Sequence, residues 1–267
     1  MCELLAVSTS HPSRLTFSLS ALSARSALPG HTRDGWGVAY FQGADVALFR
    51  EPIAASDSEL ARHLERNGPE ASVVISHIRH ATQGVIELAN TQPFMRELGG
   101  VSHCFAHNGN LVGIATDPRF ELSGRYQPVG QTDSEYAFCA LMTRLAAIWE
   151  GKQSPSIELL RSTIEAFAND IATLGPANFL YSDTKVLFAH GHRRIQEATG
   201  RIDAPGLWAL ERTCKARQDD CYEQVGSRVD TNDQRAVLFA SVPLSDEAWW
   251  PLKEGELVLV CEGAMLP

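Results

Sequence analysis

Positive charge is scarce in this sequence. Its 267 residues include 23 lysines and arginines against 32 aspartates and glutamates, which gives a formal net charge of −9 at pH 7. A protein that binds nucleic acid neutralises phosphates with a surplus of basic side chains. We therefore expect no nucleic-acid partner.

The sequence also lacks a long hydrophobic run. No stretch approaches the roughly 18 apolar residues that a membrane-spanning helix needs. The first residues contain no basic stretch followed by an apolar core, which would mark a secretory signal. We expect no membrane partner and a cytoplasmic location.

The cysteines show no Cys-x-x-Cys pair, and they do not cluster as a zinc site requires. We therefore expect no metal and no cofactor. Cys214 and Cys221 flank a polar stretch of the segment 212–234, which is expected on the surface. In a reducing compartment we expect free thiols. The six cysteines are Cys2, Cys104, Cys139, Cys214, Cys221 and Cys261.

Internal repeats, low-complexity tracts and linkers are absent as well, so we expect a single domain over residues 1–267. Hydrophobic residues make up 44% of the chain, which suffices for a proper core. Strand patterns precede and follow two long helices that begin near Thr132 and Ser156, which predicts an α+β fold with helices outside antiparallel sheets. Strands are expected at 2–8, 38–41, 46–49, 73–75, 101–107, 177–182, 185–190, 206–212, 235–243 and 256–261, and further helices at 13–27 and from a Ser56–Glu59 capping box to Asn67.

The most informative residue that is present is Cys2. If Met1 is removed, Cys2 carries a thiol and a free α-amine, and the amine can take the thiol proton while the sulfur attacks a carbonyl. Ordinary pKa values of about 8.5 for a thiol and about 8 for an α-amine leave both groups poised close to neutral pH. Retention of Met1 would remove this base. The alternative is that Cys2 merely opens a buried strand as a small hydrophobic residue.

Four short motifs follow Cys2 in order. They are Ser-His-Ile-Arg-His-Ala-Thr-Gln-Gly at 76–84, Asn-Thr-Gln-Pro-Phe at 90–94, Ala-His-Asn-Gly-Asn at 106–110 and Gln-Thr-Asp-Ser-Glu at 131–135. With the N-terminal Met-Cys-Glu-Leu-Leu, the Asp-Gly-Trp-Gly at 34–37 and the Phe-Cys at 138–139, the chain resembles the class II glutamine amidotransferases, which are N-terminal-nucleophile hydrolases. Within them it resembles the small single-domain YafJ-type branch. The resemblance implies a four-layer αββα sandwich with two antiparallel sheets between helix layers.

Glutamine offers an α-carboxylate, an α-ammonium and a side-chain amide for recognition. Arg79 can hold the carboxylate in a two-pronged planar contact, and Asp133 can accept a hydrogen bond from the ammonium. Asn108 and Gly109 are the expected oxyanion hole, because a side-chain NH₂ and a backbone N–H can both point at the developing negative charge. With Cys2 as the nucleophile, these residues make up a complete amide-cleaving site.

Two further residues are expected to bind the substrate head group, Thr82 and His80, although Thr82 could equally be a simple loop hydroxyl. Many multidomain relatives carry Gly, Trp and His where this chain has Glu3, His80 and Gln83. These differences leave the head-group contacts intact and bear on how the pocket closes.

Each main site residue also has a structural alternative. Arg79 could form an ordinary ion pair, and Asp133 could stabilise the first turn of a helix through the helix dipole. Asn108 and Gly109 could form a plain turn between strands. His107 is expected to pack or hydrogen-bond locally.

The motifs leave the departing amine open. One interpretation is a glutaminase-type amidotransferase that forms a γ-glutamyl thioester, releases glutamate and passes ammonia to a partner protein. Another is a stand-alone hydrolase of a larger γ-glutamyl amide, which the lack of an obvious synthase domain favours. A third is an inactive protein that binds glutamine-like ligands. A conventional Cys–His hydrolase using His77 or His107 is disfavoured because the cysteine lies at the terminus.

Overall fold

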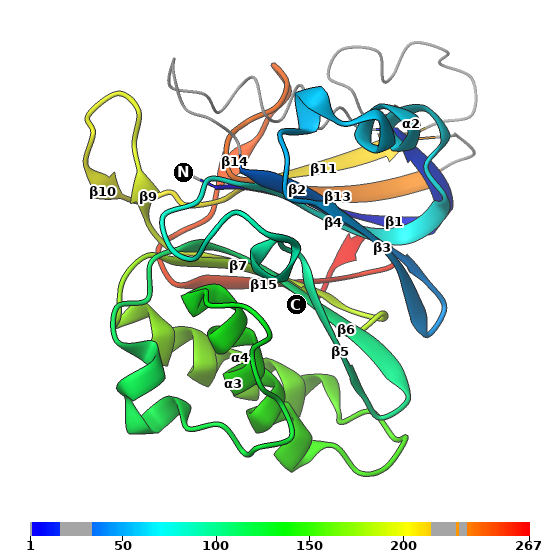
Figure 1. Ribbon diagram of the computed structural model, residues 1–267. Coiled ribbons are helices and arrows are strands. Elements are labelled where there is room, and N and C mark those ends of the chain that lie inside the picture. The colour runs from blue at the N-terminus through cyan, green and yellow to red at the C-terminus, as the bar shows by residue number, and fades with distance from the viewer. Residues whose placement is uncertain (1, 17–33, 215–227, 230–233) are drawn as a thin grey trace.

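The computed structural model describes residues 2–16, 34–214, 228–229 and 234–267 (Figure 1). In these ranges most strands belong to two antiparallel sheets that lie face to face, and a small hairpin is formed by β9 (Arg194–Ile195) and β10 (Ile202–Asp203). Among the described helices none is long and apolar enough to cross a membrane.

The first sheet has the order β14-β11-β13-β1-β4-β2-β3, and β12 pairs with β1. Because β1 lies between β4 and β13, the start of the chain runs through the middle of this sheet. Glu3 pairs with Ile78, so Cys2 comes level with the end of β4. The bounds are β1 Glu3–Thr16, β2 Gly35–Gln42, β3 Asp45–Glu51, β4 Glu70–Arg79, β11 Trp208–Cys214, β12 Arg228–Val229, β13 Gln234–Ala240 and β14 Trp250–Pro251.

The second sheet has the order β16-β15-β8-β7-β6-β5. Asn108 pairs with Asn178 and Gly109 with Ala177, so the end of β6 lies beside the start of β7. The bounds are β5 Phe94–Leu98, β6 Val101–Gly109, β7 Ala177–Ser182, β8 Leu187–Gly191, β15 Glu256–Cys261 and β16 Ala264–Met265.

Helices cover the outer faces of both sheets, which confirms the predicted four-layer sandwich (Figure 1). Helix α2 (Glu59–Asn67) packs on the first sheet, and α3 (Asp133–Ile148) with α4 (Ile157–Ala172) on the second. Short 3₁₀ turns connect these elements at η1 Ala55–Asp57, η2 Leu88–Asn90, η3 Ile114–Thr116 and η4 Pro118–Phe120.

The alternation of side chains along β1 shows why the sheets stack. Leu4 and Ala6 are fully buried in the core between the two sheets. Leu5 and Val7 are buried on the other face, in the core under α2. Since successive strand residues point to opposite faces, a strand that is apolar at every position must be covered on both sides. The N-terminal strand is therefore an interior strand.

The helix predicted at 13–27 is wrong where the structure describes it. After a bulge, Ser13 and Arg14 pair with Ala71 and Glu70, and β1 continues to Thr16. Sheet pairing outweighs the helical spacing of leucines in this segment. Residues 17–27 lie outside the described residues, as do Cys221, the side chain of Cys214 and most of the segment 212–234.

The predicted N-cap of α2 was two residues too early. Ser58, and not Ser56, precedes the helix, and its hydroxyl accepts a hydrogen bond from the Ala61 N–H at 2.9 Å. At α3 the prediction is confirmed, since the Thr132 hydroxyl accepts from the Glu135 N–H at 3.2 Å. The predicted strands are confirmed within a few residues, and β5 is an edge strand that the sequence did not predict.

Truncation of Phe105 is predicted to destabilise the protein strongly. This fully buried ring stacks on Phe138 and Phe179, with centroids 5.4 Å apart in both pairs. Phe105→Ala should lower the free energy of unfolding by about 3–5 kcal/mol, because it leaves a cavity beneath α3. Leu159→Ala on the exposed side of α4 (43% exposed) is the control and should change it by about 0.5 kcal/mol or less. Urea unfolding measures both, and equal losses would contradict this description of the core.

Candidate active site

The thiol of Cys2 lies against the backbone at the end of β4. Its Sγ accepts a hydrogen bond from the His80 N–H at 3.3 Å and is 3.4 Å from the His80 carbonyl oxygen. The residue is half-buried. Burial raises the pKa of the Cys2 thiol to about 11, although the backbone contact with His80 acts in the opposite direction. The thiol by itself is therefore protonated at neutral pH and needs a base to become a nucleophile.

Asn108 reaches Cys2 from the other sheet. Its Nδ2 donates to the Cys2 carbonyl oxygen at 2.6 Å, and the side chain is only 4% exposed. An amide NH₂ has two hydrogens, so a second donor remains for a ligand beside Cys2. Residues 106 positions apart in the chain thus meet where β4 and β6 end.

A residue that sequence analysis missed holds Asn108 in place. Asn178, on β7, is fully buried, and its Nδ2 donates to the carbonyl oxygens of Asn108 at 3.0 Å and Arg193 at 2.7 Å. Its Oδ1 accepts from the His192 N–H at 2.7 Å. The only sequence signal was an Asn in an otherwise apolar strand, since a buried amide needs several partners.

Gly109 fits only as glycine. A Cβ there would lie 1.8 Å from the Pro176 carbonyl oxygen and 2.6 Å from Nε2 of His107. His107 is buried, and its Nδ1 is 2.9 Å from the Ser134 hydroxyl of α3. Burial lowers the pKa of His107, which keeps the ring neutral. The local packing role predicted for His107 is confirmed.

Arg79 is buried, and its guanidinium faces its own loop. Its Nη atoms donate to the carbonyl oxygens of Gln83 at 2.9 Å, Gly84 at 3.2 Å and Val85 at 3.1 Å. An incoming carboxylate must replace some of these oxygens or use the remaining N–H groups. The contact between Arg79 and a substrate carboxylate therefore stays a prediction.

A second residue without a predicted role, Asp34, fixes the turn after β4. Its Oδ2 accepts from the Ala81 N–H at 2.7 Å, and its N–H donates to the Arg79 carbonyl oxygen at 3.0 Å. Oδ2 of Asp34 is also 3.8 Å from Nδ1 of the half-buried His80. Asp34 is the first residue of the motif at 34–37, but the sequence did not show which residues its carboxylate would contact. Thr82 is exposed on the same loop.

Asp133 lies at the first turn of α3 and links this helix to the end of β6. Its Oδ2 accepts from the Leu111 N–H at 2.7 Å, and its Oδ1 accepts from the Ser134 N–H at 2.8 Å. The half-buried carboxylate forms part of a cavity of about 470 Å³. The cavity is lined by Gln83, Asn110, Leu111, Val112, Gly113, Ile114, Ala115, Thr116, Pro128, Gly130, Gln131, Thr132, Asp133 and Tyr136.

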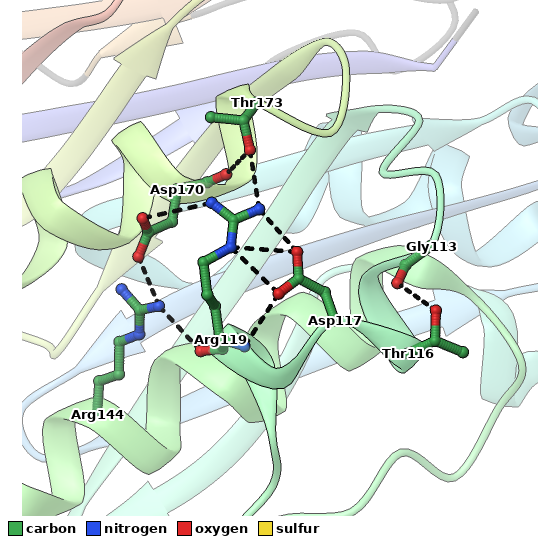
Figure 2. A network of polar contacts seen from close by, with 7 residues as sticks. All are labelled: Gly113, Thr116, Asp117, Arg119, Arg144, Asp170 and Thr173. Carbon is green, nitrogen blue, oxygen red and sulfur yellow. Dashed lines mark hydrogen bonds and ion pairs between the residues drawn. The ribbon is translucent and has the colours of Figure 1, made fainter.

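A polar network behind the cavity wall attaches it to the helices (Figure 2). Arg119 contacts the Asp117 carboxylate with Nε at 3.1 Å and Nη2 at 2.7 Å, and its Nη1 is 3.7 Å from Asp170 of α4. Arg144 of α3 pairs with the other Asp170 oxygen at 2.7 Å and donates to the Arg119 carbonyl oxygen. Since Asp117 follows the cavity-lining Thr116, the network links this wall to α3 and α4.

The structure thus forms two adjoining groups of predicted site residues. Cys2 lies with Asn108 and the backbone of His80, next to Arg79 at the end of β4. Asp133 lies at the neighbouring cavity, where it contacts Leu111, two residues after Gly109 at the end of β6. In the described ranges no three His, Cys, Asp or Glu side chains are grouped so that they could hold a metal ion.

Comparison with known proteins identifies the family of this chain. The family model of the class II glutamine amidotransferases matches residues 1–267, the full length of the chain. The chain belongs to the class II glutamine amidotransferases. It is 30% identical over 263 residues to the Escherichia coli K12 protein named "Putative glutamine amidotransferase YafJ", covering 98% of both chains. It is 36% identical over 273 residues to a Haemophilus influenzae protein named "Putative glutamine amidotransferase", covering 98% of this chain and 85% of the relative.

Solved structures show the same fold. A structure described as a predicted glutamine amidotransferase from Pseudomonas aeruginosa superposes with a TM-score of 0.69 and 30% identity, covering 100% of both chains. The glutamine phosphoribosylpyrophosphate amidotransferase of Bacillus subtilis gives a TM-score of 0.60 at 18% identity, covering 99% of this chain and 48% of the other. The second likeness supports the sandwich of two antiparallel sheets between helix layers and nothing finer.

The reactivity of Cys2 in this amidotransferase should depend on a free N-terminus. In a chain whose N-terminus is blocked by a tag, a thiol pKa of about 11 leaves on the order of one thiol in 10⁴ ionised at pH 7. Alkylation by iodoacetamide should then be slow at pH 7 and rise about tenfold per pH unit toward pH 11. Peptide mass spectrometry follows Cys2 itself, and Cys2→Ser controls for the other thiols. Fast alkylation of the blocked chain at pH 7 would contradict the buried environment.

Proposed function

We propose that this amidotransferase is an amidohydrolase in which Cys2, exposed as the N-terminal residue by removal of Met1, cleaves the γ-carboxamide of glutamine. The products are glutamate and ammonia. The activity belongs to one domain over residues 1–267, and it requires an ammonia-accepting partner protein if the nitrogen is to be transferred. The N-terminal α-amine is the base, and it acts without a metal or a cofactor.

The reaction follows from the groups around Cys2. The α-amine accepts the thiol proton, the sulfur bonds to the γ-carbonyl carbon, and the carbonyl electron pair moves to oxygen. Asn108 and Gly109 hold this oxyanion. When the C–N bond breaks, the ammonium returns its proton to the departing nitrogen and a γ-glutamyl thioester remains. Water, deprotonated by the same amine, attacks the thioester, and the sulfur leaves as the restored thiol.

The observation that carries this proposal is the 2.6 Å contact of Asn108 Nδ2 with Cys2. A donor with a second free hydrogen lies beside the only residue that can supply both nucleophile and base. Arg79 and Asp133 complete the site as the proposed carboxylate and ammonium contacts, with Thr82 and His80 on the loop between them. The raised thiol pKa supports the need for the α-amine.

Replacing Asn108 tests the oxyanion hole. In processed protein, Asn108→Ala should lower kcat for glutamate release by about 10²–10³-fold with a much smaller change in KM, because the contact strengthens only in the transition state. Cys2→Ala should abolish release. Asn169→Ala on the exposed side of α4 is the matched control and should leave kcat unchanged. A loss below about threefold in Asn108→Ala would remove Asn108 from this role.

The cavity beside Asp133 favours a second candidate, hydrolysis of a γ-glutamyl amide larger than glutamine. Its volume of about 470 Å³ falls in the range of about 300–1,000 Å³ found for sites that bury drug-sized ligands. The exposed Val112 in its lining suits an apolar part of such a substrate. In this case the enzyme acts alone and needs no ammonia acceptor.

Filling the cavity separates the two candidates. Ala115 lines it and is exposed, so Ala115→Phe should reduce its volume without disturbing the core. If a larger γ-glutamyl amide is the substrate, kcat/KM for γ-glutamyl anilides should fall at least about tenfold while that for glutamine changes less than about twofold. Ala166→Phe, at an exposed site on α4, is the control. Equal losses for both substrates would reject the second candidate.

A further inference from the structure

Directly after the nucleophile, Glu3 forms a buried ion pair with a distant residue. Its Oε1 is 2.9 Å from Nη2 of Arg194 in β9, and the two residues are 1% and 4% exposed. Nη1 of Arg194 donates to the Ser241 carbonyl oxygen, and the Ser241 hydroxyl accepts from the Leu4 N–H at 2.9 Å. Figure 1 shows the β9–β10 hairpin beside the N-terminus of the chain.

This ion pair is incomplete. Among the described residues the second carboxylate oxygen of Glu3, Oε2, has no hydrogen-bond partner although it is buried. Burial raises the pKa of Glu3 to about 7, and Arg194 together with the nearby Ser241 hydroxyl only partly offsets this effect. Removing an ion from water is costly unless its partners satisfy all of its acceptors. A second positive donor near Oε2 would complete the pair.

The α-amine of Cys2 is one residue away in the chain and becomes a positively charged donor when it is protonated. Glu3 is already close enough to act electrostatically on the Cys2 side chain, where it raises the thiol pKa, secondarily to burial. We propose that Glu3, anchored by Arg194, is a positioning residue whose free Oε2 accepts a hydrogen bond from the Cys2 α-amine released by removal of Met1. The proposal deepens the proposed function and rests on it for its catalytic consequence.

The role of Glu3 follows from the charge that appears in the first step. When the amine takes the thiol proton it becomes an ammonium, and a carboxylate beside it favours the charged form and fixes its orientation. The aspartate of a Ser-His-Asp triad acts on its histidine in the same way.

Other charged or titratable groups also surround the amine. They are the Cys2 thiol, Arg194 of β9, Arg79 at the end of β4, and His80 with Asp34 in the turn after it. The guanidinium groups oppose protonation of the amine, whereas the carboxylates of Glu3 and Asp34 favour it, and Glu3 is the one adjacent to Cys2 in the chain. Removing Glu3 should therefore lower the pKa of the amine.

The test is a titration of the amine itself. Protein labelled with ¹⁵N-cysteine, with Met1 removal verified by intact mass, shows the α-amine signal apart from the amides. Glu3→Gln should lower the midpoint of its titration by about one pH unit or more, because a nearby opposite charge shifts a pKa by about 1–3 units. Glu3→Asp, which keeps the charge, should retain most of the wild-type midpoint. Glu211→Gln, an exposed site in the same sheet, should not change it.

A paired variant covers the risk that Glu3→Gln leaves a buried guanidinium unpaired and unfolds the protein. Glu3→Gln with Arg194→Met removes both charges, and its midpoint should still lie below that of the wild type. Midpoints within about 0.3 pH unit in wild type and both variants would overturn the proposal. The acid limb of kcat/KM for glutamate release should move with the midpoint. A wild type that titrates as expected but releases no glutamate would reject the proposed function and leave the pairing of Glu3 with the amine supported.

Discussion

The hydrogen bond from the Asn108 amide to the Cys2 carbonyl oxygen joins the ends of two sheets. It depends on β1 running through the middle of the first sheet, because only there does the start of the chain end up beside β4 and above β6. A flexible N-terminus could not hold a nucleophile within one hydrogen bond of its oxyanion donor. Chain termini are usually mobile, but the sandwich holds this N-terminus in a fixed position beside Asn108, as a nucleophile requires.

The same end of the sandwich concentrates polar groups that the core must accommodate. Asn178, His107 and Glu3 are buried there, and each is tied to a segment distant in sequence. Such contacts cost desolvation and are tolerated when each group finds its partners. The apolar cores between the sheets and under the helices supply the stability, so polar residues can be accommodated at the strand ends. The network of Arg119 and Arg144 extends this support to the cavity wall.

Sequence reasoning succeeded where local physics decides. Short runs of apolar residues predicted the strands β2, β3 and β7, and the hydroxyl of Thr132 predicted the start of α3. It failed where pairing with a strand distant in sequence determines the local structure. The helix expected from residue 13 became part of β1 because β4 offers backbone partners, and no local pattern reveals such partners. The predicted site residues came from motif order, but the guanidinium of Arg79 turned out to contact its own loop.

The sequence by itself determined the family, the four-layer class of fold and the identity of the candidate nucleophile, because these depend on residue types in a fixed order along the chain. Only the tertiary structure decided which buried groups support that nucleophile. Glu3 lies in the N-terminal motif but had no predicted role, and Arg194 and Asn178 lie in no motif. Glu3 and Arg194 are 191 positions apart, and Asn178 is 70 positions from Asn108. Partners at such separations are set by how sheets stack and register, and that is a property of the whole fold.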